Sequence, residues 1–196
     1  MQKILPVAGG IKAYLASPDG LLDSETRLCP FCSDRHPLRI HGWYQRYAIQ
    51  PRTPEGGVPR IRVRRLLCAR QGRTVSFLPD FCLPRRQQGP AILALFLQAL
   101  LQGLSLLQAL RQARAEVASH SVAQSLLAGF LSRRSRILVY LAGLGARFPA
   151  PAISSGQDRW GLAPLVAGLC RGFEDAGRAF EVQARGFHDR FGLGLA

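Results

Sequence analysis

The chain has 196 residues, a formal net charge of +14 and a hydrophobic fraction of 47%. This hydrophobic fraction is enough for a packed core and excludes general disorder. The excess of 26 basic over 12 acidic residues favours a phosphate-rich partner, such as DNA, RNA or an anionic membrane surface.

The first twenty residues contain no long apolar run of the kind that a secretory signal needs. We therefore expect a cytoplasmic protein, in which paired cysteines bind metal rather than form disulfides. The most apolar stretch, residues 91–110, is interrupted by glutamines and a glycine. This pattern favours buried helices and no membrane partner.

Residues 1–26 give few signals and are interpreted as a lead-in. A β module is predicted over residues 27–83. It starts with the Cys29-Pro-Phe-Cys32 knuckle, and aromatic and branched residues then predict a strand. After a loop rich in proline and glycine at 50–59, residues 60–68 alternate arginine with apolar residues, which predicts a half-buried strand. A short strand follows from Thr74.

Two knuckles on a β scaffold, each with two cysteines separated by two residues, hold zinc through four thiolates. Here the second knuckle has Cys68, but Gln71 occupies the partner position. Three interpretations stay open. Either His36 or His41 supplies a fourth ligand to Zn²⁺, or three sulfurs bind zinc with water or another group, or the metal is lost. The metal candidates are therefore Cys29, Cys32 and Cys68, with His36 or His41.

A helical region is predicted over residues 84–148. Its first helix begins near Pro90 and ends at Gly103, a second has Ser105 as N-cap, and Ser119 or Ser121 caps one long helix or two. Helices joined by a glycine turn are typical of a helix-turn-helix. Residues 149–196 are interpreted as a linker and a weakly helical tail. The predicted fold class is α+β: an N-terminal β-hairpin, zinc-ribbon-like module followed by a helix-turn-helix-like bundle.

The run "CPFC…HGWYQRY…RIRVRRLLCARQGRTVSFLPDFCLPRR" resembles the zinc-ribbon and helix-turn-helix domains of unknown function that accompany bacterial transposases. The resemblance covers about residues 27–140, and Gln71 departs from its pattern. It implies DNA binding, with Cys29, Cys32 and Cys68 as metal ligands. The positions that carry it include His41, Gly42, Tyr44, Arg46, Thr74, Ser76, Leu78 and Pro79.

In the recognition-helix region, "SVAQSLLAGF" offers Gln124 with Ser121 and Ser125 and no arginine, so phosphate contact is favoured over base reading. The predicted nucleic-acid-binding residues are Arg46, Arg60, Arg62, Arg64, Arg65, Arg85, Arg86, Gln124, Arg133, Arg134 and Arg136.

No catalytic pattern is present, and the segment after the helices is too short for a transposase nuclease core. We predict a non-enzymatic DNA-binding module related to transposase N-terminal regions. The alternatives are a metal-free protein-interaction module, which forms a homo-oligomer through its apolar helices, and a decaying transposon remnant.

Overall fold

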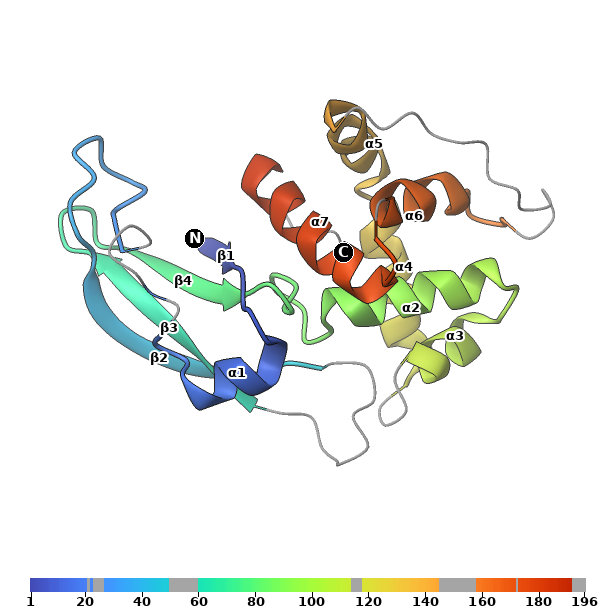
Figure 1. Ribbon diagram of the computed structural model, residues 1–196, viewed down its shortest axis with the longest axis horizontal. Coiled ribbons are helices and arrows are strands. Elements are labelled where there is room, and N and C mark those ends of the chain that lie inside the picture. The colour runs from blue at the N-terminus through green and yellow to red at the C-terminus, as the bar shows by residue number, and fades with distance from the viewer. Residues whose placement is uncertain are drawn as a thin grey trace.

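A computed structural model describes residues 1–20, 22, 27–49, 60–113, 118–144, 158–171 and 173–191. In these ranges the chain forms a four-stranded sheet beside a group of helices, so the predicted α+β fold class is confirmed (Figure 1). The loop expected at 50–59 and the linker expected at 149–157 lie outside the described residues.

The sheet has the strand order β1-β4-β3-β2. The strands are β1 (Gln2–Leu5), β2 (Arg39–Tyr47), β3 (Arg60–Cys68) and β4 (Arg73–Pro79). β2, β3 and β4 form an antiparallel meander, and β1 pairs with β4 in parallel. The three strands predicted from the pattern are therefore confirmed, whereas the lead-in differs from expectation because it supplies an edge strand and α1 (Gly10–Ala16).

The alternation in β3 separates the two faces of the sheet. Ile61 and Val63 are fully buried on one face, where they pack with Tyr14 of α1. Arg60 and Arg62 are exposed on the other face, as the sequence predicts. Further along this second face, Leu66 and Cys68 are buried beneath the knuckle that begins at Cys29.

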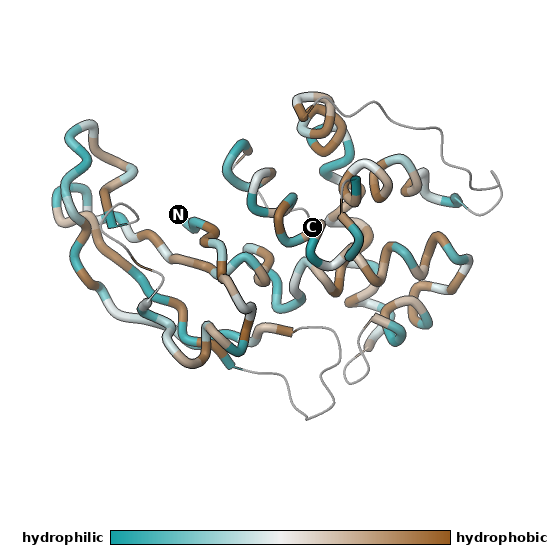
Figure 2. Tube along the Cα trace, in the orientation of Figure 1, coloured by the Kyte–Doolittle hydropathy of each residue, from teal (hydrophilic) through white to brown (hydrophobic). Residues whose placement is uncertain are grey.

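The helices are α2 (Pro90–Leu101), α3 (Leu106–Ala113), α4 (His120–Leu131), α5 (Arg134–Gly143), α6 (Ala163–Cys170) and α7 (Ala176–Phe191). The long apolar stretch becomes α2, which lies at the centre of the largest hydrophobic cluster and is largely hydrophobic along its length (Figure 2). No helix in the described part of the chain is both long and apolar enough to cross a membrane.

The predicted helix ends are set by local chemistry. Gly103 adopts a positive φ of 87°, which glycine tolerates, in the turn between α2 and α3. Ser105 and Gln108 form a reciprocal capping box at the start of α3, and the Ser119 hydroxyl accepts a hydrogen bond from the Val122 amide at the start of α4.

The C-terminal tail is more helical than the sequence suggests. α7 has 16 residues and lies between the sheet and the other helices, in contact with α2 and β1 (Figure 1). Phe180 and Phe187 are fully buried on its inner face. Tertiary packing of this apolar face stabilises a helix whose own sequence contains glycines.

Candidate metal centre and arginine surfaces

The first knuckle is a short hairpin closed by backbone hydrogen bonds. The amide of Cys29 donates to the carbonyl of His36 at 2.8 Å, and the amide of Leu38 donates to the carbonyl of Arg27 at 2.8 Å. This closure brings His36 back over Cys29 and Cys32. The fourth residue, Cys68, ends β3 and enters from the sheet below.

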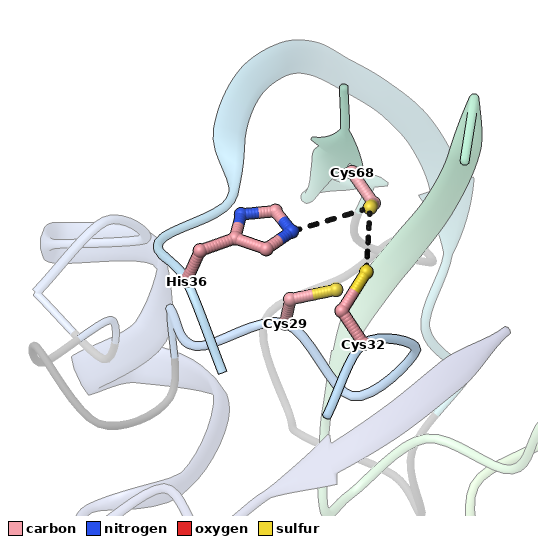
Figure 3. Close-up of side chains that lie close together, drawn as sticks. All are labelled: Cys29, Cys32, His36 and Cys68. Atoms are coloured by element: carbon pink, nitrogen blue, oxygen red, sulfur yellow. Dashed lines mark hydrogen bonds between the residues drawn. The ribbon is translucent and has the colours of Figure 1, made fainter. Parts of the chain in front are cut away.

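Four ligand atoms converge at this point. The Sγ atoms of Cys29, Cys32 and Cys68 and a ring nitrogen of His36 all lie within 4.8 Å of one another (Figure 3). The Sγ atoms of Cys32 and Cys68 are 3.6 Å apart, and Sγ of Cys68 is 3.5 Å from Nε2 of His36. The sulfur pair is too far apart for a disulfide, whose S–S bond measures about 2.05 Å.

These separations fit one tetrahedral ion. Metal–ligand bonds of about 2.3 Å to sulfur and about 2.0 Å to nitrogen, at tetrahedral angles, place neighbouring ligands about 3.5 to 3.8 Å apart. Cys29 and Cys68 are buried, with 2% and 0% of their surfaces exposed, so the sulfurs are shielded from water. The cluster could therefore hold a metal ion through three sulfurs and one imidazole.

The thiols of the cluster do not ionise equally. Burial and hydrogen bonds with the two neighbouring thiols raise the pKa of Cys32 to about 12. Burial also opposes ionisation of Cys68, but hydrogen bonds from the backbone of Gln71 and from the other two cysteines outweigh it and lower the pKa of Cys68. Cys68 therefore loses its proton more readily than Cys32, and a metal ion that binds here must displace the proton of Cys32.

Gln71 holds the two knuckles together without being a ligand. Its side-chain amide donates to the carbonyl of Phe31 at 3.1 Å. Arg70 forms an ion pair with Asp34, and the Arg73 guanidinium lies 4.3 Å from the centre of the Phe31 ring. The contacts from residues 70–73 thus fix the first knuckle over Cys68.

The remaining metal candidates lie elsewhere. His41 is exposed on β2 and is not part of the cluster, so His36 is the histidine that completes the set. Cys82 lies in a different hydrophobic cluster, where burial raises the pKa of its thiol to about 12. Both histidines follow the first knuckle closely in the sequence, and the backbone hydrogen bond between Cys29 and His36 is what places His36 at the cluster.

The predicted arginines of β3 separate into two groups. Arg60 and Arg62 are exposed, and their guanidinium groups lie 4.9 Å and 4.3 Å from the ring centres of Tyr47 and Trp43. Arg64 is paired with Asp19, and Arg65 donates to the Thr74 hydroxyl at 3.1 Å. Within this strand, Arg60, Arg62 and Arg65 have no carboxylate partner in the described structure, and of these Arg60 and Arg62 are exposed.

The side chain of Arg46 forms hydrogen bonds within the chain. Its Nη2 donates to the carbonyls of Leu83 and Arg86, and the side chain also bonds to the Cys82 thiol. These contacts connect β2 to the segment that leads into α2. Sequence reasoning placed Arg46 among the DNA-binding residues because the family motif contains it, but its guanidinium is engaged inside the chain.

A second group of arginines gathers beside α4. Arg86 donates to the hydroxyl and the carbonyl of Ser125, and Arg133 donates to the carbonyl of Gly129. Burial, followed by the charges of Arg86 and Arg136, lowers the pKa of the Arg133 guanidinium. We call Arg86, Arg133 and Arg136 the arginine cluster, because the charges of Arg86 and Arg136 act on Arg133, and none of the three is paired with a carboxylate in the described residues.

The outer face of α4 borders the arginine cluster. Ser121, Gln124, Ser125 and Ala128 are exposed at helical spacing, whereas Leu126 and other apolar residues are buried on the inner face. Two further candidates, Arg85 and Arg134, are exposed outside the cluster. Arg134 instead lies beside Gly161, before α6.

Of the apolar helices predicted to form an oligomer interface, α2 is buried within one chain. Apolar side chains of α2, including Ile92, Phe96 and Leu100, are almost fully buried against the other helices. The large apolar residues that the described helices leave exposed include Val139, on α5. A homo-oligomer stays a prediction, and α2 offers it little exposed apolar surface.

The central segment, residues 29–106, matches the model of a family described as a domain of unknown function (DUF6431). The match begins at the first cysteine of the cluster, contains β2, β3, β4 and α2, and ends at the first residue of α3. It covers less than half of the 196-residue chain. No curated protein and no solved structure matches the chain significantly. The description gives no activity, so the resemblance to transposase-associated domains stays a prediction.

Proposed function

We propose that this chain is a zinc-stabilised DNA-binding module without a catalytic centre. Zinc is the metal that the cluster fits best, because three thiolates and one imidazole are a common structural zinc set with no open position. A bound structural zinc contributes on the order of 10 kcal/mol to folding. In this proposal the metal secures the first knuckle on β3 and takes no part in chemistry.

The observation that carries the DNA-binding proposal is the arginine cluster beside the exposed polar face of α4. The positive charges of Arg86 and Arg136 repel that of Arg133, no carboxylate in the described residues is paired with them, and a bound phosphate group would reduce this repulsion. Arg86 and Arg133 are positioned by hydrogen bonds to α4 and its end, so little side-chain freedom is lost when phosphate binds.

The packing of α3 against α4 supports a helix-turn-helix role for this region. In such modules one helix enters the major groove while neighbouring groups hold the phosphate backbone. The face with Ser121, Gln124 and Ser125 would meet the groove, and the arginine cluster would meet the backbone. The small side chains on this face favour weak base reading, so most of the affinity comes from phosphate contacts.

The experiment measures binding of a labelled DNA duplex by fluorescence anisotropy at low salt. Arg136 is the best position to change because it is exposed and makes no hydrogen bond or ion pair within the described structure. We expect Arg136→Glu to weaken duplex binding by about tenfold or more, because it places a carboxylate in the arginine cluster.

Arg27→Glu is the matched control. Arg27 is also exposed and carries the same charge, and its segment lies at the opposite end of the molecule from α4 (Figure 1). We expect the control to bind duplex nearly as well as the unchanged protein. Equal losses in the two variants would mean that only net charge matters, and unchanged binding by Arg136→Glu would remove the arginine cluster from the interface.

A further inference from the structure

One surface is not used by the proposed duplex contact. The outer face of the β2–β3 hairpin carries Trp43, Gln45 and Tyr47 on one strand and Arg60 and Arg62 on the other. The pairing register places Gln45 opposite Arg62 and Tyr47 opposite Arg60, so these side chains project from the same face. We call this set the aromatic face.

The rings of the aromatic face are open to solvent. Trp43 is 48% exposed and Tyr47 is 36% exposed. The opposite face of the same hairpin is buried or half-buried, so these two rings lie on its solvent side. A guanidinium group lies over one face of each ring, Arg62 over Trp43 and Arg60 over Tyr47, so a base would stack on the opposite face. The Tyr47 hydroxyl also accepts a hydrogen bond from Arg60 at 2.7 Å. The rings therefore position the two cations as well as presenting aromatic surface.

The charge of this surface is not balanced by its surroundings. Neither β2 nor β3 contains an acidic residue. Arg60 and Arg62 form no ion pair in the described part of the chain. The carboxylate of Asp19 is paired with Arg64, further along β3. An exposed pair of aromatic rings with two unneutralised cations complements a ligand that has both flat apolar faces and negative charge.

We propose that the aromatic face binds single-stranded DNA by stacking unpaired bases on Trp43 and Tyr47. This inference rests on the proposed DNA-binding function and adds a second form of DNA at a different surface. In a duplex the base faces are covered by neighbouring bases, so only an unpaired strand can offer them to these rings. Arg60 and Arg62 then contact the phosphates of the same strand.

The dimensions of the hairpin suit more than one nucleotide. Trp43 and Tyr47 are four residues apart on β2, which corresponds to about 13 Å at a rise of about 3.3 Å per residue. Stacked nucleotides repeat at about 3.4 Å, so the two rings would hold bases that are not adjacent. Gln45 lies between them and can hydrogen-bond to the edge of an intervening base.

Tryptophan fluorescence gives a direct test, because the chain has only two tryptophans, Trp43 and Trp160. In a Trp160→Phe variant all tryptophan emission comes from Trp43. We expect an oligothymidylate of about 12 nucleotides, within the range of about 4 to 16 covered by single-strand-binding modules, to quench this emission at low salt. Absence of quenching during saturable binding would overturn the proposal, because the strand would then lie elsewhere.

The affinity test uses a labelled form of the same oligonucleotide. Trp43→Ala should weaken binding by about 10-fold to 100-fold, and Trp43→Phe should restore most of the loss because phenylalanine still stacks. Ile40→Ala, which removes another exposed apolar side chain from β2, is the control and should bind normally. Equal binding by Trp43→Ala and the control would contradict base stacking.

A duplex measured in parallel separates this proposal from the proposed function. We expect Trp43→Ala to leave duplex binding unchanged and Arg136→Glu to weaken it. If the unchanged protein binds duplex but not oligothymidylate, the aromatic-face proposal fails alone. If it binds neither, both fail. Tighter binding to oligouridylate of the same length would reject DNA as the ligand of this face.

Discussion

At the scale of single residues, the cysteine–histidine cluster depends on side chains from two distant turns. Cys29, Cys32 and His36 come from one hairpin, and Cys68 comes from the end of β3. Gln71, in the usual cysteine position, instead donates a hydrogen bond from its side-chain amide to the carbonyl of Phe31. Four candidate ligands are therefore brought together without a second cysteine in the second knuckle.

This geometry predicts the metal content of two variants. We expect the purified protein to contain one zinc ion per chain, and Gln71→Cys to contain the same amount, because His36 already provides the fourth ligand. His36→Ala should lose at least about 100-fold in zinc affinity, more than the effect of losing a group that only supports a ligand. Elemental analysis and competition with a chelator measure both quantities.

His41→Ala is the control, since this histidine lies on β2 outside the cluster. It should retain zinc with unchanged affinity. If Gln71→Cys binds zinc and the unchanged protein does not, the histidine is not a ligand and the site has decayed.

The sequence predicts three of the four ligands because two residues between cysteines are enough to form a tight turn. It leaves the fourth open, because His36 and His41 both follow the first knuckle closely. The choice depends on the hairpin that closes between Cys29 and His36, a backbone contact that spacing alone does not specify. For Arg46 the sequence leaves the kind of contact open. An arginine in a strand looks the same in the sequence whether its guanidinium contacts DNA or a backbone carbonyl.

At the scale of elements, Arg46 is one connection between the sheet and the start of the helical region, beside the backbone hydrogen bonds of Ile49. Replacing it with alanine leaves the carbonyls of Leu83 and Arg86 without this donor. We expect Arg46→Ala to lower the free energy of unfolding by about 1–3 kcal/mol, as measured by urea denaturation. Arg39→Ala, at an exposed position on the same strand, should change it by less than about 0.5 kcal/mol.

Equal stability of these two variants would show that the Arg46 hydrogen bonds contribute nothing. A loss of DNA binding by Arg46→Ala without a loss of stability would return this residue to the nucleic-acid interface, where the family resemblance places it.

Strands and helices differ in how far the sequence specifies them. Alternation in residues 60–68 predicts β3 and both of its faces, and local capping residues predict the starts of α3 and α4. β1 has only four residues and forms through pairing with β4, a contact distant in sequence. α7 likewise depends on burial of Phe180 and Phe187 against distant elements, so a local pattern gives little sign of either.

At the scale of the whole molecule, α7 joins the sheet to the helices. Nε2 of His188 lies 2.8 Å from the carbonyl of Gln2 on β1. Asp80, which follows β4, is 1% exposed and accepts a hydrogen bond from the Val7 amide. Its other carboxylate oxygen lies 3.8 Å from Arg178 and 3.9 Å from Arg185, both on α7.

The Asp80 carboxyl gives the molecule a predicted pH dependence. Burial raises its pKa above the ordinary value of 3.8, although the Val7 amide and the two arginines partly oppose this. The folded protein therefore binds the proton more tightly than the unfolded chain. Asp80 consequently lowers stability as the pH rises from 3.8 through its raised folded pKa.

We expect Asp80→Asn to remove this contribution, since asparagine keeps an acceptor for the Val7 amide and carries no charge. From acidic to neutral pH, urea denaturation should show the unchanged protein losing stability relative to the variant. The opposite trend would mean that attraction to Arg178 and Arg185 outweighs the cost of burial.

The arrangement of the whole chain also separates two cationic surfaces, the arginine cluster beside α4 and the aromatic face of the hairpin. Neither is balanced by carboxylates in the described residues, in keeping with a net charge of +14. Because each surface lies on a different module, a single strand and a duplex could contact the protein together. DNA with a junction between these forms would then bind more tightly than either form alone.

The salt dependence of duplex binding tests the central claim most directly. Each phosphate neutralised contributes about 0.9 to the slope of the logarithm of affinity against the logarithm of salt concentration. We predict a steep fall of affinity with salt for the unchanged protein, and a slope that is smaller by about 1 for Arg136→Ala but unchanged for Arg27→Ala. Binding that is insensitive to salt, or equal slopes for Arg136→Ala and the unchanged protein, would contradict the account.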